Sequence, residues 1–164
     1  MRVYVPLTVR GLTDLHRTGS IGPAPISAHA VTPALRREWD GADEEELEYA
    51  ALSMAAFDSL ARIAETDDAP RRVVVAADVD EGGVLTGDEG SGDDVTSVTV
   101  RSPIPLSLCH AVHVDDASAE GEVAQAIARL PEATSGDSEA LADVSLSETE
   151  LLWFATQEIG DLLG

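Results

Sequence analysis

The residues with the clearest chemical potential lie together in one short segment, Cys109 to Asp116, which reads CHAVHVDD. Side chains alternate between the two faces of a strand, so we expect Cys109, His113 and Asp115 to share one face. A histidine and a carboxylate two residues apart can ligate a metal, and a thiolate can add a third ligand. The alternative is a semi-buried strand whose Asp115 or Asp116 caps the following helix. His113 and Asp115 are therefore the candidate metal ligands.

A second set of residues suits contact with a partner. Arg36, Arg37 and Trp39 are close in sequence and could hold an anion or stack on another protein. The alternative is that the two arginines form salt bridges to neighbouring glutamates and fasten two helices together. Trp153 is adjacent to Phe154, so the two rings cannot point the same way, and we expect one to be a surface contact residue. The candidate partner-binding residues are Arg36, Arg37, Trp39 and Trp153.

The acidic segment 80–94 invites a calcium interpretation, because it contains five glycines and six carboxylates. An EF-hand loop requires Asp-x-Asp-x-Asp-Gly followed by a glutamate at position twelve, and this spacing is missing. We therefore expect residues 80–94 to form a flexible, solvated loop.

The composition excludes several kinds of catalytic site. All ten basic residues are arginines, so there is no phosphate-loop lysine and no Schiff-base lysine. The chain has no Gly-x-Ser-x-Gly nucleophile motif. Its single cysteine, Cys109, excludes an intrachain disulfide and fits a reducing compartment. The sequence favours a non-enzymatic protein, and we expect no cofactor.

The strongest signal is charge, because 31 acidic residues against ten arginines give a net charge of −21. Phosphate contacts need a concentrated basic face, so we expect no direct nucleic-acid binding. The longest apolar-rich stretch, Ala50 to Phe57, is far shorter than the roughly 18 residues that span a bilayer. The acidity fits a GC-rich genome, adaptation to salt, or a surface that attracts a basic partner or imitates DNA. We expect a cytoplasmic protein without a membrane segment.

Hydrophobic periodicity predicts a single α+β domain over residues 1–164, with a mixed sheet of about five strands and a possible ferredoxin-like core. The predicted strands are 2–8, 26–32, 72–79, 95–102 and 109–115, and the run of valines in 72–79 indicates a central strand covered on both faces. Residues 131–144 are expected to be a polar connection, poorly ordered or partly helical.

Helices are predicted at 9–18, 33–39, 44–65, 117–130 and 148–163. In the helix 44–65, Asp43 and Glu46 can form a capping box. Its expected buried stripe consists of Leu47, Ala50, Met54, Phe57, Ala61 and Ala64. In the helix 148–163, Ser147 and Glu150 can form a second capping box, with Leu146 and Leu151 as a hydrophobic staple. We expect this last helix to pack in the core.

The sequence resembles a family of small acidic actinobacterial proteins of unknown function. The resemblance is carried by residues 1–6 (MRVYVP), 22–39 (GPAPISAHAVTPALRREW), 43–51 (DEEELEYAA), 71–79 (RRVVVAADV), 111–117 (AVHVDDA) and 150–159 (ELLWFATQEI). It implies a bacterial cytoplasmic protein from a GC-rich source. It implies no activity, ligand or catalytic residue.

Three functional hypotheses follow from these observations. The leading one is a non-enzymatic interaction or regulatory protein that presents an acidic surface to a protein partner. The second is a small enzyme or metal-binding protein centred on His113 and Asp115. The third is a DNA mimic, which requires acidic residues arranged at the spacing of phosphates.

Overall fold

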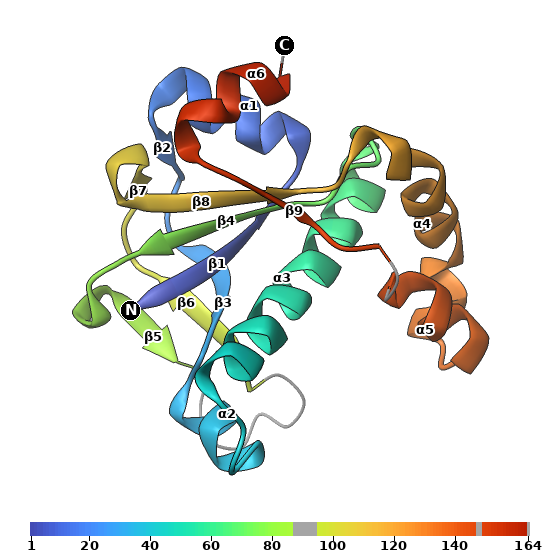
Figure 1. Ribbon diagram of the computed structural model, residues 1–164, viewed down its shortest axis with the longest axis horizontal. Helices are drawn as coiled ribbons and strands as arrows, with labels where there is room; N and C mark the ends of the chain where they lie inside the picture. Colours follow the sequence, from blue (N-terminus) through green and yellow to red (C-terminus); the bar gives the residue numbers. More distant parts are fainter. Residues whose placement is uncertain (87–94, 147–148, 164) are drawn as a thin grey trace.

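The computed structural model describes residues 1–86, 95–146 and 149–163. Its centre is a seven-stranded antiparallel sheet with the order β5-β6-β3-β1-β4-β8-β9 (Figure 1). The strands of this sheet are β1 (Arg2–Leu7), β3 (Ile26–Ala30), β4 (Val73–Asp78), β5 (Val84–Thr86), β6 (Ser97–Val100), β8 (Cys109–Val114) and β9 (Leu152–Phe154). A second, two-stranded sheet pairs β2 (Ser20–Ile21) with β7 (Ile104–Pro105). The α+β class is confirmed, whereas five strands were too few and a ferredoxin-like core is not confirmed.

The described residues form six α-helices. They are α1 (Val9–Thr18), α2 (Pro33–Glu38), α3 (Glu44–Thr66), α4 (Glu120–Thr134), α5 (Ser138–Ser145) and α6 (Ile159–Leu163). The predicted capping box at α3 is present, because Asp43 accepts from the Glu46 amide and the Glu46 side chain accepts from the Asp43 amide. Gly19 ends α1 at a φ of 79°, a left-handed conformation that favours glycine. No helix in the described part of the chain combines the length and apolarity needed to cross a bilayer.

The sheet is organised around β1, which pairs with β3 on one side and β4 on the other. Both neighbours run antiparallel to β1, so β3 and β4 are parallel to each other, and α2 and α3 form the crossover between them. This connection places α3 across one face of the sheet (Figure 1). The long helix is thereby held against β1, β3 and β4.

Both faces of the sheet are covered, and β4 supplies side chains to each. Val73 and Val75 belong to a core that also contains Leu12 of α1 and Ile159 of α6. Val74 and Ala76 point the other way, into a smaller core under α3. The prediction of a central strand buried on both faces is confirmed by β4.

The buried face of α3 differs from the predicted stripe. The residues that are buried are Leu47, Ala51, Ala55, Ala56, Ser59, Leu60 and Ile63. Small alanine side chains allow the helix axis to approach the sheet closely, which is why this face packs inward. Met54 and Phe57 were predicted to be core residues but are only half-buried. Their apolar side chains lie beside the core and line a surface cavity.

Residues 131–144 are largely helical. Helix α4 continues through Thr134, and α5 begins at Ser138 with Asp137 as its N-cap. The two helices form a hairpin that packs on Leu60 of α3 (Figure 1). Of the two alternatives predicted for this segment, the structure shows the partly helical one, in which Leu130, Ala133, Ala140 and Val144 are all buried.

The segment 80–94 is not simply a loop in the part that the structure describes. Glu81–Gly83 form one turn of 3-10 helix, and Val84–Thr86 form the edge strand β5 against β6. Residues 87–94, to which most of the prediction of flexibility applied, lie outside the described residues. A run of only three residues between glycines gave too little periodicity to identify β5 from sequence.

The predicted C-terminal helix 148–163 was wrong over its first half. Leu152–Phe154 form β9, which pairs with β8 and closes the sheet, and only Ile159–Leu163 are α-helical. Trp and Phe have high strand propensity, and the otherwise open edge of β8 offers a full set of hydrogen-bond partners. The proposed Ser147 cap lies outside the described residues. The expectation that this segment joins the core is met by Ile159, which is 1% exposed.

Candidate functional site

Strand β8 places Cys109 on the opposite face from His113, although the two were predicted to share a face. The pairing of β4 with β8 shifts register between Ala76 and Ala77, whose partners are Ala111 and Cys109. The shift leaves His110 as an extra residue and reverses the alternation, as a β-bulge does. Cys109 therefore packs in the core with Val112, and burial raises the pKa of its thiol to about 11. The prediction that Cys109 and His113 share a face was wrong.

Asp115 is the buried partner of an arginine. Its carboxylate is fully buried and accepts from Nε and Nη2 of Arg72 at 2.9 and 2.7 Å, and from the Arg72 amide at 2.8 Å. Nη2 of Arg72 also donates to the carbonyl of Thr149 at 2.7 Å. This buried pair joins β4, the end of β8 and the segment that leads to β9.

The geometry gives a metal centre on His113 and Asp115 no support. The Asp115 oxygens are engaged by Arg72, whereas His113 lies on β8 opposite Trp153 of β9. Within residues 1–86, 95–146 and 149–163, no group of three or more His, Cys, Asp or Glu side chains is placed to hold a metal ion.

A groove runs along one side of α3, between this helix and the neighbouring elements, and we call it the α3 groove. It consists of two adjoining cavities that share Tyr49 and Leu52. The first, the Arg72 cavity, has a volume of about 540 Å³ and lies between α3, the end of α5 and residues 149–151. The second, the His113 cavity, has a volume of about 290 Å³ and lies between α3 and strands β1, β4, β8 and β9.

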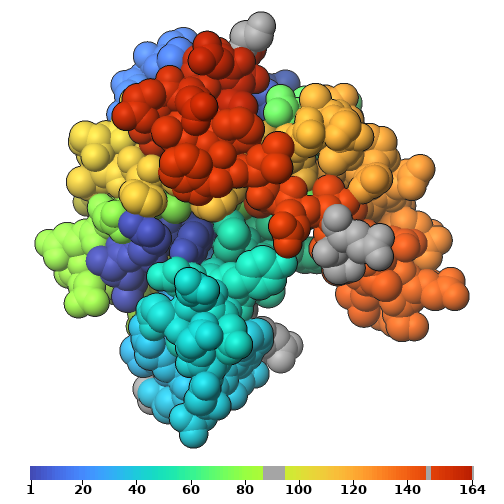
Figure 2. All heavy atoms as spheres, in the orientation of Figure 1, coloured from blue at the N-terminus to red at the C-terminus, as the bar shows by residue number. Residues whose placement is uncertain are grey.

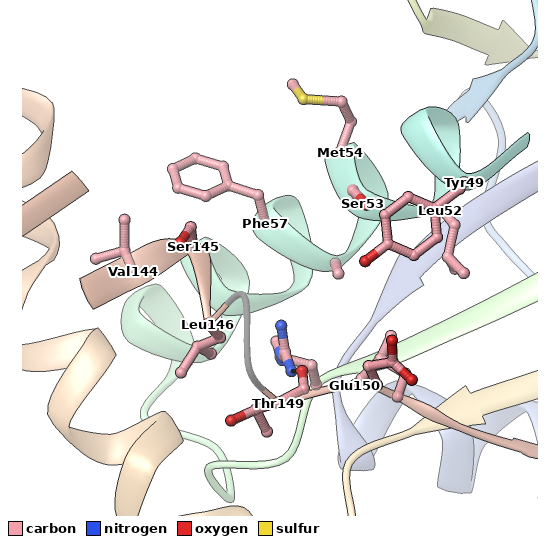
Figure 3. A pocket seen from close by; sticks show the side chains of 13 residues that line it. Tyr49, Leu52, Ser53, Met54, Phe57, Val144, Ser145, Leu146, Thr149 and Glu150 are labelled. Atoms are coloured by element: carbon pink, nitrogen blue, oxygen red, sulfur yellow. Dashed lines mark hydrogen bonds between the residues drawn. The ribbon is translucent and has the colours of Figure 1, made fainter. Parts of the chain in front are cut away.

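The Arg72 cavity is mainly apolar. Met54 and Phe57 extend from α3 on one side, while Leu146, Thr149 and Glu150 form the opposite wall (Figure 3). Arg72 lines the same cavity and is 5% exposed. The molecular surface is hollowed between α3 and α5 in Figure 2, where the α4–α5 hairpin projects beyond the sheet. Met54 and Phe57 are available to line the cavity because they lie outside the buried face of α3.

The His113 cavity contains several titratable groups. Desolvation lowers the pKa of His113 below its ordinary value, with smaller contributions from His110 and Arg2, so the imidazole is held neutral. Desolvation also raises the pKa of Tyr4 to about 12, and the charge of Glu48 adds to this effect. Both groups are therefore uncharged near neutral pH.

Two exposed aromatic side chains border the groove. Tyr49 is 60% exposed at the junction of the two cavities, and Trp153 is 58% exposed on β9. Glu45, Glu48 and Glu150 line the same cavities and bring negative charge to the apolar surface. The α3 groove thus combines aromatic contact area with carboxylates.

Of the four residues predicted to bind a partner, only Trp153 belongs to the α3 groove. Arg36 forms a bidentate salt bridge to Glu44 at 2.8 Å, which joins α2 to the start of α3 and lowers the pKa of Glu44. Arg37 is exposed on α2, and Trp39, at the end of α2, is 46% exposed. Arg36 therefore fastens α2 to α3 through a salt bridge, which was the alternative to partner binding.

Sequence reasoning missed a buried polar network on the other side of α3. His29 of β3 is 2% exposed, and its Nε2 lies 2.5 Å from a carboxylate oxygen of Asp58. Its Nδ1 lies 2.8 Å from the hydroxyl of Thr96, which is also buried. The network connects β3, α3 and the residue before β6, and burial of both His29 and Thr96 gives it a structural role.

Comparison with known proteins identifies the family but assigns no function. No curated protein and no solved structure matches the chain. One family model matches residues 1–163, which is nearly the whole chain and includes every residue of the α3 groove. On this match the protein belongs to DUF6912, a family of unknown function.

Proposed function

We propose that this protein is a non-enzymatic interaction protein whose α3 groove binds a positively charged, amphipathic segment of a protein partner. The observation that carries the proposal is the exposure of Tyr49 and Trp153 beside two apolar cavities whose linings also include carboxylates. Tyrosine and tryptophan are enriched among the residues that dominate binding energy at protein interfaces.

The apolar part of the groove supports a protein segment as the occupant. Leu52, Met54 and Phe57 are only partly covered by the fold, and they lie along the same side of α3 as Tyr49. Burying apolar area contributes about 25 cal/mol per Å², so covering this strip would favour association. An elongated apolar groove beside a helix is the kind of surface that accepts an amphipathic helix.

The charge supports a basic partner over an acidic one. Glu45 and Glu48 line the His113 cavity and Glu150 lines the Arg72 cavity, on a chain with a net charge of −21. Such a field attracts cationic segments, accelerates their association and repels anionic surfaces. Nucleic acids and anionic lipid surfaces are therefore poor occupants of this groove.

As part of the same proposal, we infer that the protein is cytoplasmic and of actinobacterial origin. The sole cysteine, Cys109, is buried as a free thiol, which is compatible with a reducing compartment. A cytoplasmic interaction protein would meet basic segments of other proteins there.

A defined peptide tests the proposal directly. The probe is a synthetic amphipathic Leu/Lys helix, and the control peptide is its scrambled isomer with the same charge. Binding is followed by the fluorescence of Trp153 in a Trp39→Phe background, since Trp39 and Trp153 are the two tryptophans. We expect saturable binding of the amphipathic peptide, a blue shift of Trp153 emission, and weaker binding of the scrambled isomer.

Two matched charge variants show whether the groove is responsible. Glu45→Lys with Glu48→Lys reverses two charges in the groove, whereas Glu120→Lys with Glu139→Lys makes the same net change on α4 and α5. The groove variant should lose about tenfold or more in affinity, and the control should lose much less. Equal losses would show that only the overall charge matters and would overturn the proposal.

A further inference from the structure

We infer that the Arg72 cavity is the anchoring site of the α3 groove. It receives one large uncharged apolar side chain of the partner segment, and Arg72 donates a hydrogen bond to a main-chain carbonyl next to that side chain. The inference rests on the proposed function and specifies what the partner must contain.

The shape and lining of the cavity support an apolar anchor. Its volume of about 540 Å³ is within the range of about 300–1,000 Å³ found for ligand pockets. The walls are formed chiefly by Met54, Phe57, Leu146 and Leu151, with the Ser53 hydroxyl and the Thr149 backbone nearby. In Figure 3 the Phe57 ring extends from α3 toward the side of α5 that carries Val144. An aliphatic or aromatic side chain would contact apolar atoms from both α3 and α5.

Arg72 supplies the polar feature of the site. Its Nε and Nη2 are used by Asp115 and Thr149, but Nη1 forms no hydrogen bond to any residue within the described ranges. The side chain is 95% buried, since only 5% is exposed, and it lines the cavity. Nη1 itself is not fully buried, so it can donate to an acceptor that a ligand brings into the cavity.

The acceptor should be uncharged. Asp115 already neutralises the guanidinium at 2.7 Å, and Glu150 adds another carboxylate to the cavity lining. A ligand carboxylate would be repelled by both acids, whereas a peptide carbonyl would accept the hydrogen bond without that repulsion. The carboxylates of the α3 groove then attract the positive charge of the partner, and the Arg72 cavity binds its apolar anchor.

The experiment uses a cavity-filling variant and a matched control on the same helix. Ser53→Trp places an indole in the Arg72 cavity, whereas Ala64→Trp adds the same ring at an exposed position of α3 outside both cavities. One probe is the neutral dye N-phenyl-1-naphthylamine, which reports apolar cavities by enhanced fluorescence. The other is the Leu/Lys peptide, with binding measured by calorimetry.

We expect the peptide to displace the dye from the wild-type protein. Ser53→Trp should abolish dye binding and weaken the peptide about tenfold or more, while Ala64→Trp should leave both unchanged. Arg72→Lys, which keeps a cation beside Asp115 but removes Nη1, should weaken the peptide further than the dye. Ser53→Trp remains decisive if the lysine variant does not fold.

The possible failures are distinguishable. If the peptide binds Ser53→Trp as tightly as wild type, the anchor inference is wrong while the proposed function stands. If the wild-type protein binds both the dye and the peptide but the peptide does not displace the dye, the peptide lies outside the Arg72 cavity and the inference is again wrong. If the wild-type protein binds the dye and no peptide, the proposed function fails, and the anchor inference fails with it.

Discussion

At the scale of single residues, the Arg72–Asp115 pair has a structural role beside the binding role that we infer for Arg72. Both side chains are buried, and the guanidinium holds together a strand, the end of its neighbour and the segment before β9. Buried ion pairs add little stability over an apolar alternative, but removal of one partner leaves an uncompensated charge. The pair therefore constrains the position of the Thr149 backbone that borders the Arg72 cavity.

We predict that Asp115→Asn lowers the free energy of unfolding by about 3–5 kcal/mol, because Arg72 then remains charged and buried. The matched control is Asp78→Asn, which breaks the exposed pair with Arg2 and should cost only about 0–1 kcal/mol. Urea denaturation of both variants measures the difference. Similar losses for the two would show that the burial of Arg72 has no special energetic consequence.

At the scale of secondary-structure elements, α6 is small but completes the larger core. It has five residues, of which Ile159 packs in the cluster that also contains Leu12 and Leu15 of α1. Leu152, on the preceding strand β9, is 43% exposed. The two residues are therefore a matched pair for separating core burial from edge-strand packing.

Ile159→Ala should destabilise the protein by about 2–5 kcal/mol, because it removes buried methyl groups and leaves a cavity between α1 and the sheet. Leu152→Ala should cost well under half as much, since that side chain is already largely in water. Thermal and chemical denaturation check both variants. Equal effects would mean that α6 can separate from the core without loss.

A helix or strand could be predicted from the sequence where neighbouring residues determine its conformation. The capping residues Asp43 and Glu46 and the valines of β4 identified their elements from sequence, because the cap and the buried run are properties of neighbouring residues. Strand β9 was mistaken for helix because its conformation is set by pairing with β8, more than 30 residues away in sequence. Local periodicity contains no information on such a pairing.

The candidate site was less predictable than the fold. Trp153 was identified as a contact residue, but the Arg72 cavity depends on which face of α3 packs inward. The stripe that included Met54 and Phe57 had the correct period and the wrong phase, so two cavity residues were assigned to the core. The sequence did contain one signal for the cavity. The helix has more large apolar side chains than one buried face can hold, so some of them had to lie at the surface.

At the scale of the whole molecule, charge is the dominant property. Ten arginines can neutralise at most ten of the 31 acidic residues, so the folded chain keeps a net charge of −21. Compaction brings these charges closer together, which opposes folding and keeps the protein from associating with itself. The same negative field would attract the basic partner that we propose for the α3 groove.

We predict that the melting temperature rises between low salt and about 0.5 M NaCl, because ions screen charges beyond a Debye length of about 8–10 Å near physiological salt. Each kcal/mol of relieved repulsion should add about 2–4 °C for a chain of this size. The Glu120→Lys/Glu139→Lys variant removes two negative charges and adds two positive ones, which changes the net charge from −21 to −17, and it should show a smaller rise. A melting temperature that stays constant or falls as salt is added would show that attractive ion pairs outweigh the repulsion.

The contact between α1 and α6 has a consequence for synthesis on the ribosome. Leu12 and Leu15 are synthesised well over one hundred residues before Ile159, although all three pack in the same core. The nascent chain must therefore carry an incompletely covered apolar surface until translation has passed residue 159, and a product truncated before that point would expose it to chaperones and proteases.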